Sequence, residues 1–282
     1  MAGSRIIERV DTVQVSPFTK VTYDVLGQGT EPLLLLHGFS GSSQNWEPIL
    51  PLLTAANPAI VVDLLGHGRA AAPDDPQRYR METAAADLAA LINDITRPPV
   101  NLIGYSMGGR LALYLALHYP QLVNRLILES ASPGLASSAE RQARRQQDET
   151  LANWLEEKGI AAFVDYWEAL PLWHSQAQLE PAKRAWLRQQ RLQNSPTGLA
   201  NSLRGMGSGA QPNLWPRLAE LPQPVLLVAG ELDPKFVAIN QAMAARLPQA
   251  ELVIVPDAGH TVHLERPLAY AHLCNTFLNS GL

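Results

Sequence analysis

The sequence is poor in cysteine and has no long apolar run. Its one cysteine, Cys274, cannot form a disulfide within the chain, so we expect a reducing compartment, the cytoplasm. Cys274 lies in an apolar stretch near the C-terminus, which predicts a buried, space-filling residue rather than a nucleophile. No apolar run is long enough to cross a bilayer, and residues 1–11 lack the apolar core of a signal peptide. We therefore expect no membrane insertion.

Strong charge of either sign is also missing. The formal net charge is −4, with 17% charged residues, whereas nucleic-acid-binding proteins usually carry a marked basic excess. We therefore expect no nucleic-acid partner. A chain of 282 residues can bury a large core, as one large domain or as a core with an inserted subdomain. The composition does not indicate an oligomeric state.

Short, continuously apolar runs recur along the chain and alternate with helical patterns. Continuous rather than alternating hydrophobicity is typical of strands covered on both faces, as in a parallel sheet between helices. The predicted strands are residues 33–36, 59–62, 101–103, 126–128, 225–228 and 252–255, and the clearest helices are residues 83–95, 107–118 and 267–278. The alternation predicts an α/β fold with a mostly parallel central sheet flanked by helices.

Residues 131–220 interrupt this alternation. They show helical patterns without a convincing buried strand, and they hold five of the six tryptophans. We interpret them as a helical cap inserted into the core. The predicted organisation is residues 1–130 and 221–282 for the core and residues 131–220 for the cap.

Ser106 lies in the strongest local motif, Gly104-Tyr105-Ser106-Met107-Gly108. The motif follows a predicted strand and begins a predicted helix, which is the setting of a nucleophile turn. Such a turn is tight, so small flanking residues are needed. The start of the helix also places backbone N–H groups beside the serine oxygen. We expect Ser106 to be the reactive residue.

A serine hydroxyl needs a group that accepts its proton. His260 follows the run 252–255, and Asp233 follows the run 225–228, so both lie where ligands bind in open α/β sheets. The expected roles are His260 as base and Asp233 as the carboxylate that orients its ring. Ser106, Asp233 and His260 form the predicted catalytic triad.

Other residues near these positions compete for the same roles. His263 and Glu265 lie close to His260, and Glu231 lies close to Asp233. We prefer His260 because Gly259 precedes it in a loop that can reach toward Ser106. His67 is interpreted as a loop residue near the site, and no pair of histidines has metal-ligand spacing, so no metal is expected.

A developing oxyanion needs hydrogen-bond donors. The segment His37-Gly38-Phe39-Ser40 follows the first predicted buried strand, and Met107 begins the helix after Ser106. We assign the two donors to the backbone N–H groups of Phe39 and Met107.

Taken together, these motifs resemble the α/β-hydrolase superfamily along nearly the whole chain. The motifs are His37-Gly38, Asp63-x-x-Gly66-His67-Gly68, the turn at Ser106, Asp233 and Gly259-His260. Since this fold supports many reactions, the substrate has to be inferred from other residues.

Arginines provide that further evidence. Arg110 lies one helical turn after Ser106, and several arginines of the cap could also bind carboxylates, although most are expected on the solvated surface. The chain looks like the MenH family, the 2-succinyl-6-hydroxy-2,4-cyclohexadiene-1-carboxylate synthases. The matching segments are Gly104 to Arg110, Glu129-x-x-x-Pro133-Gly134-Leu135, Gly230-Glu231-x-Asp233-x-Lys235-Phe236, Arg191-Leu192-Gln193-Asn194 and Ser202-Leu203-Arg204-Gly205-Met206-Gly207.

The resemblance implies a lyase of menaquinone or phylloquinone biosynthesis. It would remove a proton from 2-succinyl-5-enolpyruvyl-6-hydroxy-3-cyclohexene-1-carboxylate, a small-molecule tricarboxylate, and eliminate pyruvate without a cofactor or metal. Tyr105, Arg110, Arg144, Trp167 and Arg191 would contact the substrate, with Arg141 and Arg145 as alternatives to Arg144.

Two other functions use the same residues. One is a serine hydrolase of esters or C–C bonds, and the other is a non-catalytic receptor for a small molecule. An epoxide hydrolase or a dehalogenase is excluded, because these enzymes need a carboxylate at the position of Ser106.

Overall fold

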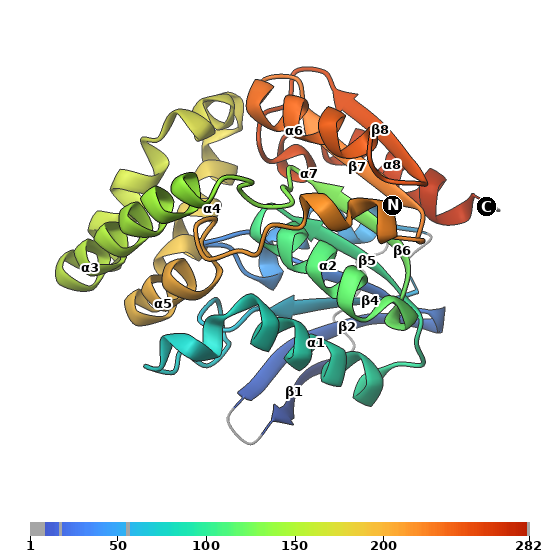
Figure 1. The fold of residues 1–282 in the computed structure, drawn as a ribbon, viewed down its shortest axis with the longest axis horizontal. Helices are drawn as coiled ribbons and strands as arrows, with labels where there is room; N and C mark the ends of the chain where they lie inside the picture. Colours follow the sequence, from blue (N-terminus) through green and yellow to red (C-terminus); the bar gives the residue numbers. More distant parts are fainter. Residues whose placement is uncertain (1–8, 17–18, 55–56, 281–282) are drawn as a thin grey trace.

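The computed structural model describes residues 9–16, 19–54 and 57–280, and within them eight strands form one sheet (Figure 1). The order across the sheet is β1-β2-β4-β3-β5-β6-β7-β8. β3 to β8 are parallel, whereas β2 is antiparallel to both β1 and β4. The strands are β1 (Arg9–Ser16), β2 (Thr19–Glu31), β3 (Leu33–Leu36), β4 (Asn57–Asp63), β5 (Val100–Tyr105), β6 (Val123–Glu129), β7 (Val225–Gly230) and β8 (Ala250–Val255). The predicted mostly parallel sheet is confirmed, and the six predicted runs lie in β3 to β8.

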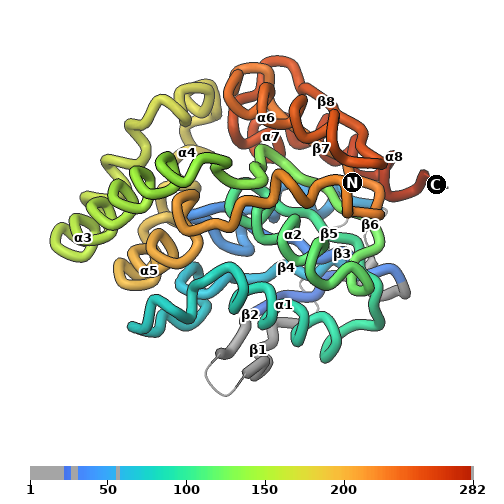
Figure 2. Tube along the Cα trace, viewed as in Figure 1, coloured from blue at the N-terminus to red at the C-terminus, as the bar shows by residue number. Residues whose placement is uncertain are grey.

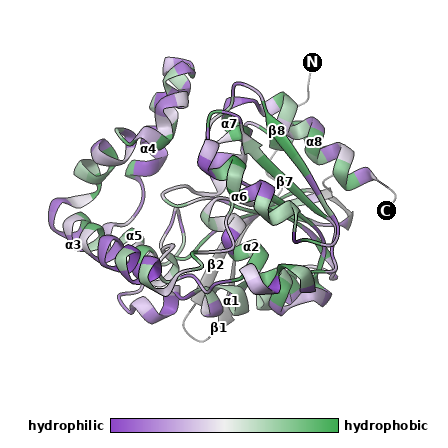
Figure 3. Ribbon diagram, turned by 45° about the horizontal axis from the view of Figure 1, so that its top comes forward, coloured by the Kyte–Doolittle hydropathy of each residue, from purple (hydrophilic) through white to green (hydrophobic). Residues whose placement is uncertain are grey.

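Helices cover both faces of the sheet, which explains the continuous apolar runs. Leu34 and Leu36 of β3 pack in one apolar cluster with α1 and α2, whereas Leu33 and Leu35 pack in a second cluster with α8. Successive side chains of a strand point to opposite faces, so each face of β3 needs leucines. Figure 3 shows the same apolar character along β7. The helices are α1 (Met81–Ile95), α2 (Met107–His118), α6 (Pro234–Ala244), α7 (Val262–Glu265) and α8 (Pro267–Asn279).

The chain between β6 and β7 is helical. Figures 1 and 2 show α3, α4 and α5 together at one side of the molecule. They have their own apolar cluster, in which Leu155 and Phe163 pack against Leu199 and Leu203. The helices are α3 (Ser138–Glu168), α4 (Pro181–Leu192) and α5 (Pro196–Met206), with short 3-10 helices η5 (Pro171–Gln178) and η6 (Trp215–Glu220). We call the segment 131–220 the cap, and its bounds as a separate unit stay an interpretation.

Gly159 divides α3 into two helical segments. Its φ of 79° and ψ of 176° lie outside the helical region, in a conformation that only glycine adopts easily. The two halves of α3 therefore run in different directions. The N-terminal half carries Arg144, and the C-terminal half carries Trp167.

The parallel strands place four loops at one edge of the sheet. The loops after β3, β5, β7 and β8 carry Phe39, Ser106, Asp233 and His260, and these strands are close neighbours in the sheet. Carboxyl ends of parallel strands are where α/β folds bind ligands. Over the described ranges, no helix combines the length and apolar character needed to span a membrane.

Candidate active site

Ser106 occupies a strained turn between β5 and α2. Its φ of 48° and ψ of −106° are unfavourable for a residue with a side chain. The Ser106 N–H donates to the Glu129 carbonyl oxygen at 2.8 Å, which holds the turn against β6. A Cβ atom on Gly104 would lie 2.6 Å from both the Gly108 carbonyl oxygen and the Gly109 Cα, so a side chain at residue 104 would not fit. The turn predicted from the sequence is present.

A chain of hydrogen bonds joins Ser106 to His260 and Asp233. Ser106 Oγ lies 3.0 Å from His260 Nε2, and His260 Nδ1 lies 2.6 Å from Asp233 Oδ2. With a proton on Nδ1 held by the carboxylate, Nε2 is the acceptor for the serine hydroxyl. The side chains of His260 and Asp233 are only 3% and 7% exposed, so bulk water competes little for these bonds. The structure brings the three predicted residues together.

The loops after β7 and β8 support each other. Gly230 and Gly259 lie so close that a side chain on Gly230 would overlap the Gly259 carbonyl oxygen. Asp233 is the N-cap residue before α6, and its Oδ1 accepts from the Phe236 N–H at 3.4 Å. Glu265 accepts from the Gly259 N–H at 2.7 Å, which fixes the loop before His260. Glu265, a competitor by sequence, thus supports the loop that carries His260.

The other competitors also have structural partners. His263 Nδ1 lies 2.8 Å from Glu129 Oε2, and both side chains are fully buried. Glu231 accepts from the Asp257 N–H at 3.3 Å. None of these contacts involves Ser106. His67 is buried beside His37 and Phe39, and burial lowers the pKa of its imidazole to about 3, so its ring is neutral.

The two predicted oxyanion donors follow two neighbouring strands of the sheet. Phe39 follows β3, and Met107 is the first residue of α2. Across the described ranges, neither backbone N–H donates to a protein acceptor. Both residues line the cavity that contains Ser106, and their role as oxyanion donors stays a prediction.

A cavity of about 450 Å³ opens beside Ser106 and His260. It lies between the sheet edge and the cap, because residues of α2, α3, α5 and α6 all line it. The predicted substrate-binding residues in its lining are Tyr105, Arg110, Arg144 and Trp167. Neither Arg141 nor Arg145 lines it, so among the three neighbouring arginines the structure places Arg144 in the cavity.

Arg110 carries a charge with little compensation. Its Nη1 donates to the Met206 carbonyl oxygen at 2.7 Å and to Gln211 Oε1 at 3.2 Å, and no carboxylate within the described ranges pairs with it. Burial lowers the pKa of its guanidinium to about 10, and repulsion from Arg144 contributes, whereas Asp148 opposes the shift. Arg110 is still cationic near neutral pH. A largely buried cation without a carboxylate is suited to an anionic ligand.

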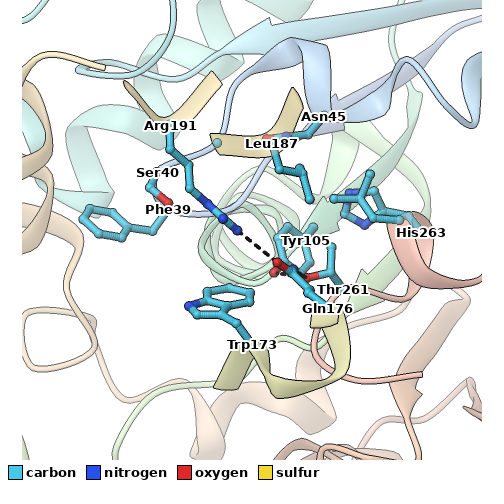
Figure 4. Close-up of a pocket in the computed structure, with 12 residues that line it drawn as sticks. Phe39, Ser40, Asn45, Tyr105, Trp173, Gln176, Leu187, Arg191, Thr261 and His263 are labelled. Atoms are coloured by element: carbon cyan, nitrogen blue, oxygen red, sulfur yellow. Dashed lines mark hydrogen bonds between the residues drawn. The ribbon is translucent and has the colours of Figure 1, made fainter. Parts of the chain in front are cut away.

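Arg191 lies in a different place from the other predicted binding residues. It lines a small cavity of about 30 Å³, shown in Figure 4, and is not in the lining of the large one. Its Nη1 pairs with Glu168 Oε1 at 2.8 Å, and its Nη2 donates to Gln176 Oε1 at 3.2 Å. Phe39, Tyr105 and Trp173 line both cavities, so the small cavity adjoins the large one. The predicted contact of Arg191 with substrate stays a prediction.

The cavity residues without a site role in the sequence analysis include Trp173, Lys235 and Phe236. Trp173 and Phe236 enclose the ring of His260, with ring centroids 5.7 Å and 4.6 Å away. Lys235 lies beside Phe236 in the lining. Trp173 is one of several cap tryptophans that look alike in sequence, whereas Lys235 and Phe236 were part of a family motif and could have been assigned. No group of three or more His, Cys, Asp and Glu side chains among the described residues could hold a metal ion.

The chain belongs to the alpha/beta hydrolase fold family, whose model matches residues 31–267. Within that family it is 44% identical to a Bacillus subtilis protein, over 95% of this chain and 99% of that protein. That relative is named, provisionally, 2-succinyl-6-hydroxy-2,4-cyclohexadiene-1-carboxylate synthase. A Serratia proteamaculans protein of the same name is 32% identical, over 90% of this chain and 96% of that protein.

A solved structure agrees with these relatives. The structure of MenH from S. aureus has a TM-score of 0.87 and 37% identity, and the match covers 91% of this chain and 97% of that chain. The resemblance noted from sequence motifs, to the fold family and to the synthases, is confirmed.

Proposed function

We propose that this chain is a 2-succinyl-6-hydroxy-2,4-cyclohexadiene-1-carboxylate synthase, a carbon–oxygen lyase that eliminates pyruvate. One observation carries the proposal: Ser106, hydrogen-bonded to His260, shares a cavity with the largely buried guanidinium of Arg110, which pairs with no carboxylate of the described residues. An anionic substrate would supply the missing counter-charge. The names of the relatives support the same reaction.

The substrate by this proposal is 2-succinyl-5-enolpyruvyl-6-hydroxy-3-cyclohexene-1-carboxylate, which carries three carboxylates. Arg110 and Arg144 in the cavity would bind carboxylates and hold the acidic C–H bond beside the succinyl ketone near Ser106. The roles of Tyr105, Trp167 and Arg191 as further contacts belong to this proposal.

The proposed reaction combines proton transfers with the cleavage of one C–O bond. His260 Nε2 accepts the hydroxyl proton of Ser106, and Ser106 Oγ removes the substrate proton beside the ketone. The electron pair of that C–H bond forms an enolate, whose oxygen the N–H groups of Phe39 and Met107 would hold. The enolate then returns its electrons through the ring C=C bond and breaks the C–O bond to the enolpyruvyl group. Pyruvate leaves as its enolate and takes the proton from the His260 imidazolium.

In this mechanism Asp233 stabilises the imidazolium that exists between the two proton transfers. Its Oδ2 lies 2.6 Å from His260 Nδ1, which suits a charge-assisted hydrogen bond. No covalent bond to Ser106 forms at any step. The reaction is shared by routes to menaquinone and phylloquinone, and we propose that it takes place in the cytoplasm.

A serine hydrolase is the second candidate, because the same Ser106–His260–Asp233 geometry suits acyl transfer. The two candidates differ in their products. The purified chain is incubated with the enolpyruvyl substrate, and pyruvate is measured by coupling to lactate dehydrogenase. We expect one pyruvate per diene formed, and release that is about 10³-fold slower or more with Ser106→Ala. Turnover of simple esters without any pyruvate from the enolpyruvyl substrate would support the hydrolase instead.

A further inference from the structure

Lys235 contributes a third positive charge to the large cavity. It lies in the first turn of α6, two residues after Asp233, and it lines the cavity together with Arg110 and Arg144. Its Nζ is 5.7 Å from the centroid of the Phe236 ring, and that ring packs 4.6 Å from the ring of His260. The ammonium group is therefore near the reactive end of the cavity.

Lys235 differs from Arg144 and Arg191 in its partners, and resembles Arg110. Arg144 is paired with Asp148 at 2.7 Å, and Arg191 is paired with Glu168. Lys235 is exposed, and no carboxylate within the described ranges pairs with it. An exposed ammonium group is solvated when the cavity contains no ligand, so it can bind an incoming carboxylate without first breaking an ion pair.

The cavity lining contains fewer negatively charged than positively charged side chains. Among the described lining residues, Glu140 is the one carboxylate, facing the cations Arg110, Arg144 and Lys235. Asp148 lies outside the lining and pairs with Arg144, so Arg110 and Lys235 against Glu140 leave an excess of positive charge. A tricarboxylate would compensate that excess, whereas a neutral ester would not.

We propose that Lys235 is a substrate-binding residue that pairs with one carboxylate of the substrate. This inference rests on the proposed function, because it takes the three carboxylates from the proposed substrate. Lys235 acts on binding and steering of the anion rather than on proton transfer, which Ser106 and His260 perform. Its contribution therefore appears mainly in KM and in the dependence on salt.

Lys235→Gln, made in the full chain, tests this role through steady-state pyruvate release. We expect KM to rise by about fivefold or more, with kcat changing by less than about threefold. The fall of kcat/KM with added salt becomes shallower, because one of the attracting charges is gone. Lys235→Arg keeps the charge and retains a KM within about threefold of the original chain.

Lys158→Gln is the matched control. Lys158 lies in α3, pairs with Glu157 and does not line the cavity, so its loss leaves KM and the salt dependence unchanged. A thermal unfolding midpoint that is the same for all three variants shows that they fold.

Two outcomes overturn different parts of the account. If the original chain releases pyruvate and Lys235→Gln keeps both its KM and its salt dependence, the role of Lys235 is wrong and the proposed function stands. If the original chain releases no pyruvate, the proposed function is wrong, and the role of Lys235 is lost with it.

Discussion

At the scale of single residues, the surroundings of Ser106 decide what its hydroxyl does. The strained turn and the bond to His260 Nε2 would activate either a nucleophile or a base. The difference comes from Arg110 and Arg144, which line the same cavity and favour an anionic substrate; in the proposed function that substrate has an acidic C–H bond. By this account the turn exposes Oγ for proton removal, and no acyl-enzyme is needed.

Ser106 and His260 are expected to act as one unit, which a double substitution can test. Ser106→Ala and His260→Ala should each lower kcat by about 10³-fold or more, because neither side chain can remove the substrate proton alone. The double variant should then be no more than about tenfold slower than either single variant. Pyruvate release measures all three rates. Losses that multiply fully in the double variant would mean that the two residues act independently.

Some residue positions could be predicted from sequence and others could not. Ser106, Asp233 and His260 each follow a predicted strand, and parallel strands bring such positions to one edge. Arg191 has no such constraint, because its place depends on how α4 packs and on the ion pair with Glu168. Sequence spacing cannot reveal an ion pair between helices that are formed by different parts of the cap.

At the scale of elements, the sheet was easier to predict than the cap. β3 to β8 are apolar enough to be recognised one by one, whereas the β1–β2 hairpin mixes polar and apolar residues and was not predicted. The predicted helix 107–118 has the observed bounds of α2. In the cap, the break in α3 depends on one glycine, which sequence alone does not distinguish from a glycine inside a regular helix.

Gly159 offers a test of how the bend in α3 is maintained. Gly159→Ala should lower the free energy of unfolding by about 1–3 kcal/mol, since alanine is strained at this φ and ψ even though a Cβ would meet no atom. Denaturant unfolding measures the change. Lys158→Ala, one residue earlier and exposed, is the control and should change the free energy by less than about 0.5 kcal/mol. A gain in stability on Gly159→Ala would show that α3 can straighten.

At the scale of the whole molecule, the proposed site is expected to reduce the stability of the fold. A pKa of Arg110 lowered by burial means that folding disfavours its charged form. This cost is fully present below pH 10 and declines as the pH rises above it, because the folded chain then loses the proton before the unfolded chain does. The cation is retained at that cost because, in the proposed function, a substrate carboxylate compensates it.

Replacing Arg110 with an uncharged residue should therefore lower the activity without lowering the stability. Arg110→Met should leave the thermal midpoint unchanged or raised, and should lower kcat/KM by about 30-fold or more, equivalent to ~2 kcal/mol. Arg125→Met is a control with the reverse expected outcome, a loss of stability without a loss of activity. Arg125 Nη1 donates to Ser280 Oγ at 3.2 Å near the C-terminal helix, so its loss should lower the midpoint and leave the kinetics unchanged. Unchanged kinetics for Arg110→Met would place Arg110 outside the site.

The central claim is that Ser106 removes a proton and never forms a covalent bond. Mass spectrometry of a reaction quenched during turnover tests it directly, because one sample reports both the products and the intact protein. We expect pyruvate and the diene in equal amounts, with the mass of the chain unchanged. A mass increase located at Ser106, or substrate turnover without pyruvate, would contradict it.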